Sequence, residues 1–273
     1  MSFINALRAE FSKLFTLRLW WILLLILIGY VAFIAATLAA VFLGLADLAS
    51  TGGSPMPSKG EVPRLVFSCA SAIGYVFPVL LGALATTAEF RNQTLTPTFL
   101  ASPKRATVLV AKLLALAVMG ALYGAGALLG SVGVGAPLIA ALGGDPALDS
   151  SDTWAMFGRI LIAMSLWAVI GVALGALVRS QVATIVVVLA FTQFFEPILR
   201  LGASLWDWAA QIGRFLPGAA SDALVGSSIF TSLGASTAHT VSLEWWQGGL
   251  VLLGVAVVAA VLGYFVTWVK DVT

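Results

Sequence analysis

The sequence has almost none of the residues from which reactive or metal-binding sites are usually built. Its 273 residues include one histidine and one cysteine. Cys69 has no partner for a disulfide within the chain, and we interpret it as a small buried residue. His239 has no second histidine or cysteine near it in the sequence, so we interpret it as a loop residue and predict no metal site.

Charge is equally scarce. Asp, Glu, Lys and Arg make up 10% of the residues, whereas a soluble domain has about 25%. Hydrophobic residues make up 60%, and the mean hydropathy is +1.05. Long apolar runs satisfy their backbone hydrogen bonds in lipid by forming helices. The composition therefore predicts an all-α integral membrane protein.

Six apolar runs are long enough to cross a bilayer, which requires about 20 helical residues. We predict spans at 19–44, 65–87, 113–142, 154–178, 182–195 and 248–269. The first follows Arg8, Lys13 and Arg18, but it is longer than the core of about 7–15 residues in a signal peptide, so we expect it to be retained. The third is long enough to tilt or to extend beyond the membrane. The fifth is short, and we expect Glu196, Pro197 and Arg200 to break it.

The distribution of basic residues predicts the direction of the spans. If both termini are cytoplasmic, the inner segments contain nine of the 14 Lys and Arg residues but three of the 12 acids. Cytoplasmic loops carry an excess of Lys and Arg, so we predict that both termini are cytoplasmic. Residues 196–246 then lie outside, where Pro197 and Pro217 predict short broken helices. An interfacial aromatic belt is expected from Trp206, Trp208, Trp245 and Trp246.

The sequence lacks the residues that several classes of function require. The middle of each predicted span contains no ionisable residue, which disfavours proton or sodium coupling. The spans also lack paired carboxylates, a histidine-containing metal site and a nucleophile beside a base, so we predict no enzymatic activity. No G-x-x-x-x-G-K-[ST] phosphate loop occurs. If the chain drives uphill transport, the energy comes from another polypeptide that contacts its cytoplasmic face.

Glycines at a spacing of four predict close helix contacts within the chain rather than a dedicated dimer interface. The pairs are Gly120 and Gly124, Gly126 and Gly130, and Gly171 and Gly175.

Residues 1–18 predict an amphipathic helix at the inner membrane interface, or a simple basic anchor for the first span. The apolar side chains recur every three or four residues, at Phe3, Leu7, Phe11, Leu14 and Phe15. We expect the polar side chains to lie mostly elsewhere around the helix: Arg8, Glu10, Ser12 and Lys13.

Residues 89–112 form the largest predicted cytoplasmic loop and the start of the third span. Ser102 and Pro103 are typical of a helix N-cap and first residue, so we expect a helix from there into the span. Arg105 and Lys112 are two turns apart on one face, placed for phospholipid headgroups or an acidic partner surface. A docking partner could bury the apolar and hydroxyl cluster of Thr94, Leu95, Phe99 and Leu100.

Three segments resemble ABC-2 type permeases, the membrane subunits of ATP-binding-cassette exporters. The segments "EFRNQTL" and "LASPKRATVLVAK" look like the family's cytoplasmic loop between the second and third spans. The N-terminal "LRAEFSKLFTLRLWWIL" is similar to its amphipathic connecting helix, and "RFLPGAASDALV" resembles its extracellular segment before the last span. The resemblance covers essentially the whole chain.

This resemblance implies a short coupling helix within 89–105 that docks on a separate cytoplasmic ATPase. The matching positions are Glu89, Arg91, Thr94, Leu95, Leu100, Pro103, Arg105 and Lys112. Pro97 departs from the family pattern, which has an uninterrupted helical turn there. The resemblance also implies two permease chains, identical or related, with a substrate path between them. Two ATPase subunits would bind ATP and Mg, and this chain itself would hold no cofactor.

We therefore interpret the chain as the permease subunit of an exporter in a bacterial inner membrane. Few polar groups line its spans, so we expect an amphipathic or lipid-like substrate such as a drug, antibiotic, peptide or lipid. Candidate substrate-path residues are Ser71, Tyr75, Thr192 and Gln193. Membrane lipid is an expected partner and nucleic acid is not. The alternatives are a passive channel or facilitator, and a non-transporting membrane assembly or immunity factor.

Overall fold

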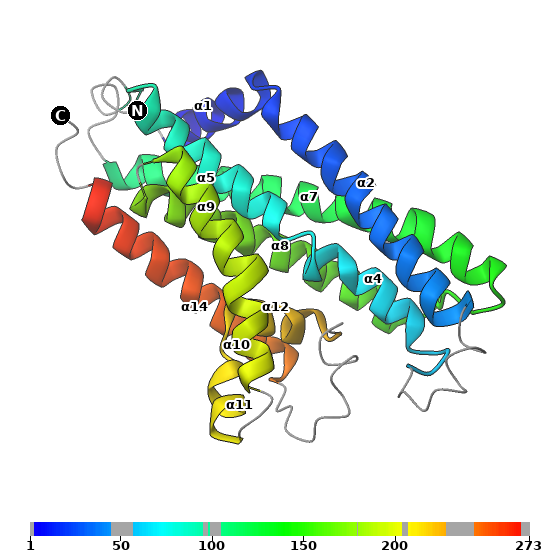
Figure 1. The fold of residues 1–273 in the computed structure, drawn as a ribbon. Coiled ribbons are helices and arrows are strands. Elements are labelled where there is room, and N and C mark those ends of the chain that lie inside the picture. Colours follow the sequence, from blue (N-terminus) through cyan, green and yellow to red (C-terminus); the bar gives the residue numbers. More distant parts are fainter. Residues whose placement is uncertain are drawn as a thin grey trace.

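The computed structural model describes residues 3–44, 57–94, 98, 105–178, 180–203, 207–227 and 243–268. These residues form helices and the turns that connect them, and no strand occurs among them (Figure 1). The first half contains α1 (Phe3–Thr16), α2 (Leu19–Ala39), the π-helical turn η1 (Ala40–Gly44), α4 (Val62–Ala72), α5 (Val76–Arg91) and α7 (Arg105–Ala141). The second half contains α8 (Ser151–Leu177), α9 (Gln181–Ala190), η3 (Phe191–Phe195), α10 (Glu196–Ala203), α11 (Asp207–Gly213), α12 (Pro217–Val225), α14 (Trp245–Gly263) and η4 (Tyr264–Trp268).

Six helical segments are long and apolar enough to cross a membrane, which confirms the predicted number of spans. They are Leu19–Gly44, Val62–Arg91, Arg105–Ala141, Ser151–Leu177, Gln181–Arg200 and Trp245–Val266. The described chain is thus an all-helical, multi-pass membrane protein. The third segment is the longest, at 37 residues. Such a helix measures about 55 Å at 1.5 Å per residue, so it exceeds the thickness of a bilayer core.

The expected break of the fifth span at Glu196 and Pro197 is wrong. The helix continues from α9 through the π-helical turn η3 into α10, which ends at Ala203. Proline lacks an N–H and its ring clashes with the carbonyl of an ordinary α-helical turn before it. The preceding turn is wider, because the N–H of Glu196 bonds the carbonyl of Phe191, five residues earlier. This π-helical turn lets the chain pass Pro197 and remain helical.

The second span is interrupted instead. It consists of α4 and α5, separated by residues 73–75. Pro78 lies in the first turn of α5, where a missing N–H costs little, whereas a continuous helix would need that N–H to bond Gly74. Ile73 and Tyr75 at this break line a cavity together with Thr192 and Gln193 of the fifth span.

The centre of the bundle depends on glycines that let helices approach closely. A Cβ at Gly171 on α8 would lie 2.9 Å from the Cα of Val79 on α5, and one at Gly130 on α7 would lie 2.6 Å from the carbonyl oxygen of Ile28 on α2. The other members of the three predicted pairs also face neighbouring helices: Gly120 and Gly124 face α8, Gly126 faces α2, and Gly175 faces α5. The prediction that these pairs pack within the chain is confirmed.

The helices define two ends of the bundle (Figure 1). We call one the α1 end: it holds α1, the C-terminal end of α5, the beginnings of α7 and α9, and η4. Arg91 of α5 donates to Gln181 of α9 across 3.1 Å there, and Arg105 of α7 donates to the carbonyl of Trp268 across 3.0 Å. We call the other the far end: it holds the beginnings of α4 and α8, the end of α7, and α10 to α12.

Helix α1 packs on the bundle by a face that overlaps the expected apolar one, because Leu14 is buried and Leu7 and Phe11 are half-buried against the core. Its buried residues are Ala6, Glu10 and Leu14, which follow one another at intervals of four. Phe3 and Phe15 are exposed. The expectation that Glu10 lies away from the packed face is wrong, because cations on this helix and on α7 make burial of its carboxylate possible.

Candidate functional site

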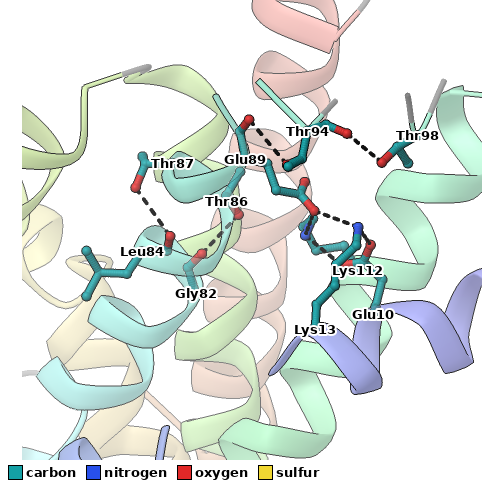
Figure 2. A network of polar contacts seen from close by, with 10 residues as sticks. All are labelled: Glu10, Lys13, Gly82, Leu84, Thr86, Thr87, Glu89, Thr94, Thr98 and Lys112. Atoms are coloured by element: carbon teal, nitrogen blue, oxygen red, sulfur yellow. Dashed lines mark hydrogen bonds and ion pairs between the residues drawn. The ribbon is translucent and has the colours of Figure 1, made fainter. Parts of the chain in front are cut away.

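Four charged side chains from three helices meet at the α1 end (Figure 2). We call them the four-charge cluster: Glu10 and Lys13 of α1, Glu89 of α5 and Lys112 of α7. The Nζ atom of Lys13 lies 2.7 Å from Glu10 Oε1 and 2.8 Å from Glu89 Oε1. The Nζ atom of Lys112 lies 2.6 Å from Glu10 Oε2 and 3.1 Å from Glu89 Oε1. Each lysine therefore bridges both carboxylates, and the cluster has no net charge.

Three of the four members are buried and Lys13 is half-buried, which makes the balance of charge essential. Glu10 and Lys112 are each 2% exposed, and Glu89 is 6% exposed. Removing an ion from water costs several kcal/mol, and only close opposite charges with good hydrogen-bond geometry offset that cost. Loss of one member would leave an uncompensated ion between the helices. The cluster thus stabilises one relative arrangement of α1, α5 and α7.

In this cluster, opposite charges shift the pKa values of Glu10 and Lys13 more than burial does. Burial raises the pKa of Glu10, but the nearby ammonium groups of Lys112 and Lys13 outweigh it and hold the pKa below its ordinary value. Burial likewise lowers the pKa of Lys13, yet the carboxylates of Glu89 and Glu10 outweigh it and raise the pKa. Both groups are therefore charged at neutral pH.

The four-charge cluster includes Glu89, the first residue of the predicted docking loop. The carbonyl of Glu89 accepts hydrogen bonds from the backbone N–H of Thr94, at 3.1 Å, and from its hydroxyl, at 3.5 Å. Thr98 donates its hydroxyl to the carbonyl of Thr94 across 2.7 Å (Figure 2). The second carboxylate oxygen of Glu89, Oε2, is buried and receives no hydrogen bond from the described residues. The start of the loop is thus bonded to the same glutamate that joins α5 to α1 and α7.

The predicted docking residues that the structure describes lie together at the α1 end, in different environments. Arg91 and Thr94 are exposed, whereas Arg105 is half-buried and bonds the Trp268 carbonyl. Glu89 is buried and its carboxylate faces Lys13 and Lys112 rather than the surface. The other predicted positions of this loop, Leu95, Pro97, Phe99, Leu100, Ser102 and Pro103, lie outside the described residues.

The expected exposure of Lys112 to headgroups or to a partner surface is wrong. Its side chain is turned into the bundle, where two carboxylates bind its ammonium group. Sequence reasoning missed this role because it treated Arg105 and Lys112 as one exposed face. The signal available was the apolar sequence around Lys112, "TVLVAKLLALAV", in which a charge requires a partner. A second signal was the spacing of Ala6, Glu10 and Leu14 on one face of α1.

A second polar site lies near the far end, at the break between α4 and α5. A cavity of about 90 Å³ there is lined by Ala72, Ile73, Tyr75, Thr192, Gln193, Glu196, Pro197, Arg200, Gly218, Ser221 and Asp222. We call it the far-end cavity. The hydroxyl of Tyr75 donates to the carbonyl of Thr192 across 3.3 Å and so joins the second and fifth spans. The ring of Tyr75 stacks on Trp167, with centroids 4.4 Å apart, and Trp167 donates to the hydroxyl of Ser221.

Three of the four predicted substrate-path residues line this cavity: Tyr75, Thr192 and Gln193. Ser71 does not line it. Its hydroxyl is buried and donates to the carbonyl of Ser68 within α4, across 3.1 Å. Sequence reasoning missed Glu196, Arg200 and Asp222 at the same cavity, because it placed the first two at a broken helix end and gave Asp222 no role.

The described residues include no group of three or more His, Cys, Asp or Glu side chains that could hold a metal ion. Cys69 is buried, as the sequence predicted. His239 lies outside the described residues.

The fold and the two polar sites define a multi-pass helical membrane protein with charged residues concentrated at the ends of its spans. No protein-family model matches the chain, and no curated protein matches it significantly. The geometry of the four-charge cluster and of the far-end cavity therefore carries the functional argument.

Proposed function

We propose that the chain is the permease subunit of an ATP-driven exporter, in which a cytoplasmic ATPase acts on the α1 end. The observation that carries the proposal is the four-charge cluster, which bonds the start of the loop after α5 to two other helices. A force applied to that loop would move α5 together with α1 and α7. The resemblance of the loop and of α1 to the corresponding elements of ABC-2 type permeases supports the same conclusion.

The charge distribution supports a cytoplasmic location of the α1 end. Its described residues include six basic side chains, Arg8, Lys13, Arg18, Arg91, Arg105 and Lys112, against the acids Glu10 and Glu89. An excess of Lys and Arg is typical of cytoplasmic segments. In this proposal both termini are cytoplasmic, the membrane is a bacterial inner membrane, and the ATPase subunits hold the ATP and Mg.

The path would be shared by two permease chains, identical or related. Helices α2, α9 and α14 leave many large apolar side chains exposed, including Phe33, Val182 and Val258. Such surfaces suit lipid or a second chain. The proposed cargo is amphipathic, because the far-end cavity places a few polar groups between otherwise apolar helices.

Copurification with a candidate ATPase tests the proposal. The chain, coexpressed with an ATPase encoded beside it, is expected to form a complex whose ATP hydrolysis exceeds that of the free ATPase. Arg91→Glu reverses an exposed charge at the α1 end and is expected to reduce that stimulation at least fivefold. Arg64→Glu is the matched control, because Arg64 is exposed at the far end and pairs only with exposed Asp152 among the described residues.

Two results would contradict the proposal. One is unchanged complex formation and ATP hydrolysis in the Arg91→Glu variant. The other is transport by the chain alone in liposomes. Downhill flux without nucleotide would support a passive facilitator, and absence of flux with or without any ATPase would support a non-transporting membrane factor.

A further inference from the structure

Carboxylates outnumber cations among the residues that line the far-end cavity. Two carboxylates, Glu196 and Asp222, and one guanidinium, Arg200, line it. The Nη1 atom of Arg200 lies 2.7 Å from Asp222 Oδ2, and its Nη2 atom lies 2.9 Å from Glu196 Oε1. One guanidinium is therefore shared between two carboxylates. With both acids ionised, the three groups carry a net charge of two negatives and one positive, or −1.

Glu196 has one carboxylate oxygen that none of these three groups bonds. It is 2% exposed. Its Oε1 atom accepts from Nε and Nη2 of Arg200, at 3.2 and 2.9 Å. Its Oε2 atom is buried and receives no hydrogen bond from the described residues. A buried acceptor without a donor is costly, and more so when it is charged, so this oxygen favours a ligand that brings both a donor and a positive charge.

We propose that the far-end cavity binds the ammonium group of an organic amine, with Glu196 Oε2 as its principal acceptor. One ammonium group would bring the net charge of the three side chains to zero. Gln193, Ser221 and Tyr75 place further polar side chains in the lining.

Other ligand chemistries fit less well. An anion would meet the buried carboxylate oxygen Glu196 Oε2, which is itself an acceptor. A divalent metal prefers several carboxylate or carbonyl oxygens, whereas here a guanidinium lies between the two carboxylates. Hydrogen-bond chemistry also discriminates among amines. Glu196 Oε2 requires an N–H donor, which a primary ammonium group supplies and a quaternary one lacks.

As a statement about exported cargo, this inference depends on the proposed function and narrows its substrate class to amphipathic amines. The binding itself needs no ATPase. A chain that binds amines but never associates with an ATPase would refute the proposed function and leave the site intact. A chain that stimulates an ATPase but does not bind amines would refute the amine site and leave the proposed function intact.

The test uses the full chain, purified in a non-ionic detergent without ATPase. Thermal unfolding is followed while butylammonium chloride, tetramethylammonium chloride or 1-butanol is titrated at constant ionic strength. We expect a saturable rise in melting temperature with butylammonium only. Equal responses to butanol or to tetramethylammonium, or a response that does not saturate, would overturn the proposal, and this comparison requires no variant.

A matched pair of variants locates the site. Glu196→Gln keeps the shape of the side chain and removes its charge, so we expect at least a tenfold loss of affinity for butylammonium. Glu61→Gln makes the same chemical change at an exposed residue that bonds Ser58, and its affinity should equal that of the wild type. Gly218→Ala keeps every charge but would place a Cβ against the carboxylate of Glu196, and we expect it to lose binding as well.

Melting without ligand separates a binding site from a purely structural ion pair. If Glu196 served only to hold Arg200, Glu196→Gln would lower the melting temperature and leave any amine response unchanged. Under our proposal the substitution removes one of two buried carboxylates that share a single guanidinium. Its melting temperature without amine should therefore equal or exceed that of the wild type, while the amine-dependent rise disappears.

Discussion

Lys112 shows how a single side chain can join three helices. Its ammonium group lies on α7 but binds a carboxylate of α1 and another of α5. At 2% exposure it cannot exchange these partners for water without local unfolding. The contribution of Lys112 to stability therefore depends on Glu10 and Glu89, and the contribution of these two acids depends on Lys112.

Replacement of this lysine gives the first prediction. Lys112→Met keeps the length of the side chain and leaves two buried carboxylates with one cation. We expect the free energy of unfolding in detergent to fall by about 3 kcal/mol, as for other broken buried ion pairs. The double variant Lys112→Met with Glu89→Gln restores the balance of charge and should recover at least half of that loss.

Arg8→Met provides the control for this measurement. Arg8 lies on α1 beside the cluster but is exposed, so its loss should change the free energy of unfolding by less than about 0.5 kcal/mol. A single Lys112→Met variant as stable as Arg8→Met would show that the cluster does not hold the helices together.

The pKa shifts of the same cluster predict a pH dependence. The folded pKa of Glu10 is below its ordinary value of 4.5, so its contribution to stability is present above 4.5 and is lost as pH falls through the folded pKa. The folded pKa of Lys13 is above 10.5, so its contribution is present below 10.5 and is lost as pH rises through the folded pKa. The melting temperature should be level between these values and fall on both sides.

Glu10→Gln should remove the acid-dependent part of this profile. A variant whose melting temperature still falls by the same amount below pH 4.5 would assign the acid sensitivity to other groups.

At the scale of elements, the contact between α5 and α8 depends on the absence of side chains. Gly82 on α5 faces the backbone of α8, where an added Cβ would lie 2.8 Å from the amide nitrogen of Val172, and Gly171 on α8 faces the backbone of Val79 on α5. Lipid provides little hydrophobic drive between helices, so close backbone approach supplies much of the attraction.

Two alanine substitutions on one helix test this contact. Gly171→Ala would force α8 away from α5, and we expect a loss of about 1–3 kcal/mol in the free energy of unfolding. Gly158→Ala lies on the same helix with no atom within 4 Å of its added Cβ, and it should be neutral or stabilising by up to about 1 kcal/mol. Equal effects of the two substitutions would contradict close packing at Gly171.

The interruption between α4 and α5 and the π-helical turn of the fifth span have a joint consequence. The break brings Tyr75 to the carbonyl of Thr192 on the facing span, and the turn before Pro197 directs Glu196 to the same cavity. Two local departures from regular helix, each shortly before a proline, thus place polar groups at one cavity among apolar helices.

At the scale of the whole molecule, the separation of the α1 end from the far end predicts which residues are reached from outside a cell. In a Cys69→Ala background, Lys59→Cys at the far end should react with a membrane-impermeant maleimide in intact cells. Arg8→Cys at the α1 end should react only after lysis. Both positions are exposed, so a difference between them reports the membrane side. Labelling of Arg8→Cys in intact cells would reverse the proposed orientation.

The sequence alone was sufficient for the number of spans and for the intrachain contacts of the glycine pairs. An apolar run of about 20 residues can satisfy its backbone in lipid only as a helix, so composition and length decide the element locally. Glycine spacing decides, in the same local way, which helix faces lack side chains. The positions of Tyr75, Thr192 and Gln193 could be selected because a polar residue in an apolar run is conspicuous.

Which charged side chains pair across the bundle was decided only by the tertiary structure. Glu10 and Lys112 are 102 positions apart, and Arg200 and Asp222 lie on different helices. No local pattern specifies which distant charge will neutralise a buried one, because that depends on how the helices cross. For the same reason the sequence placed Lys112 and Glu10 on exposed faces. Burial of a charge is decided by whether packing brings an opposite charge within hydrogen-bond distance, and a linear pattern cannot measure that distance.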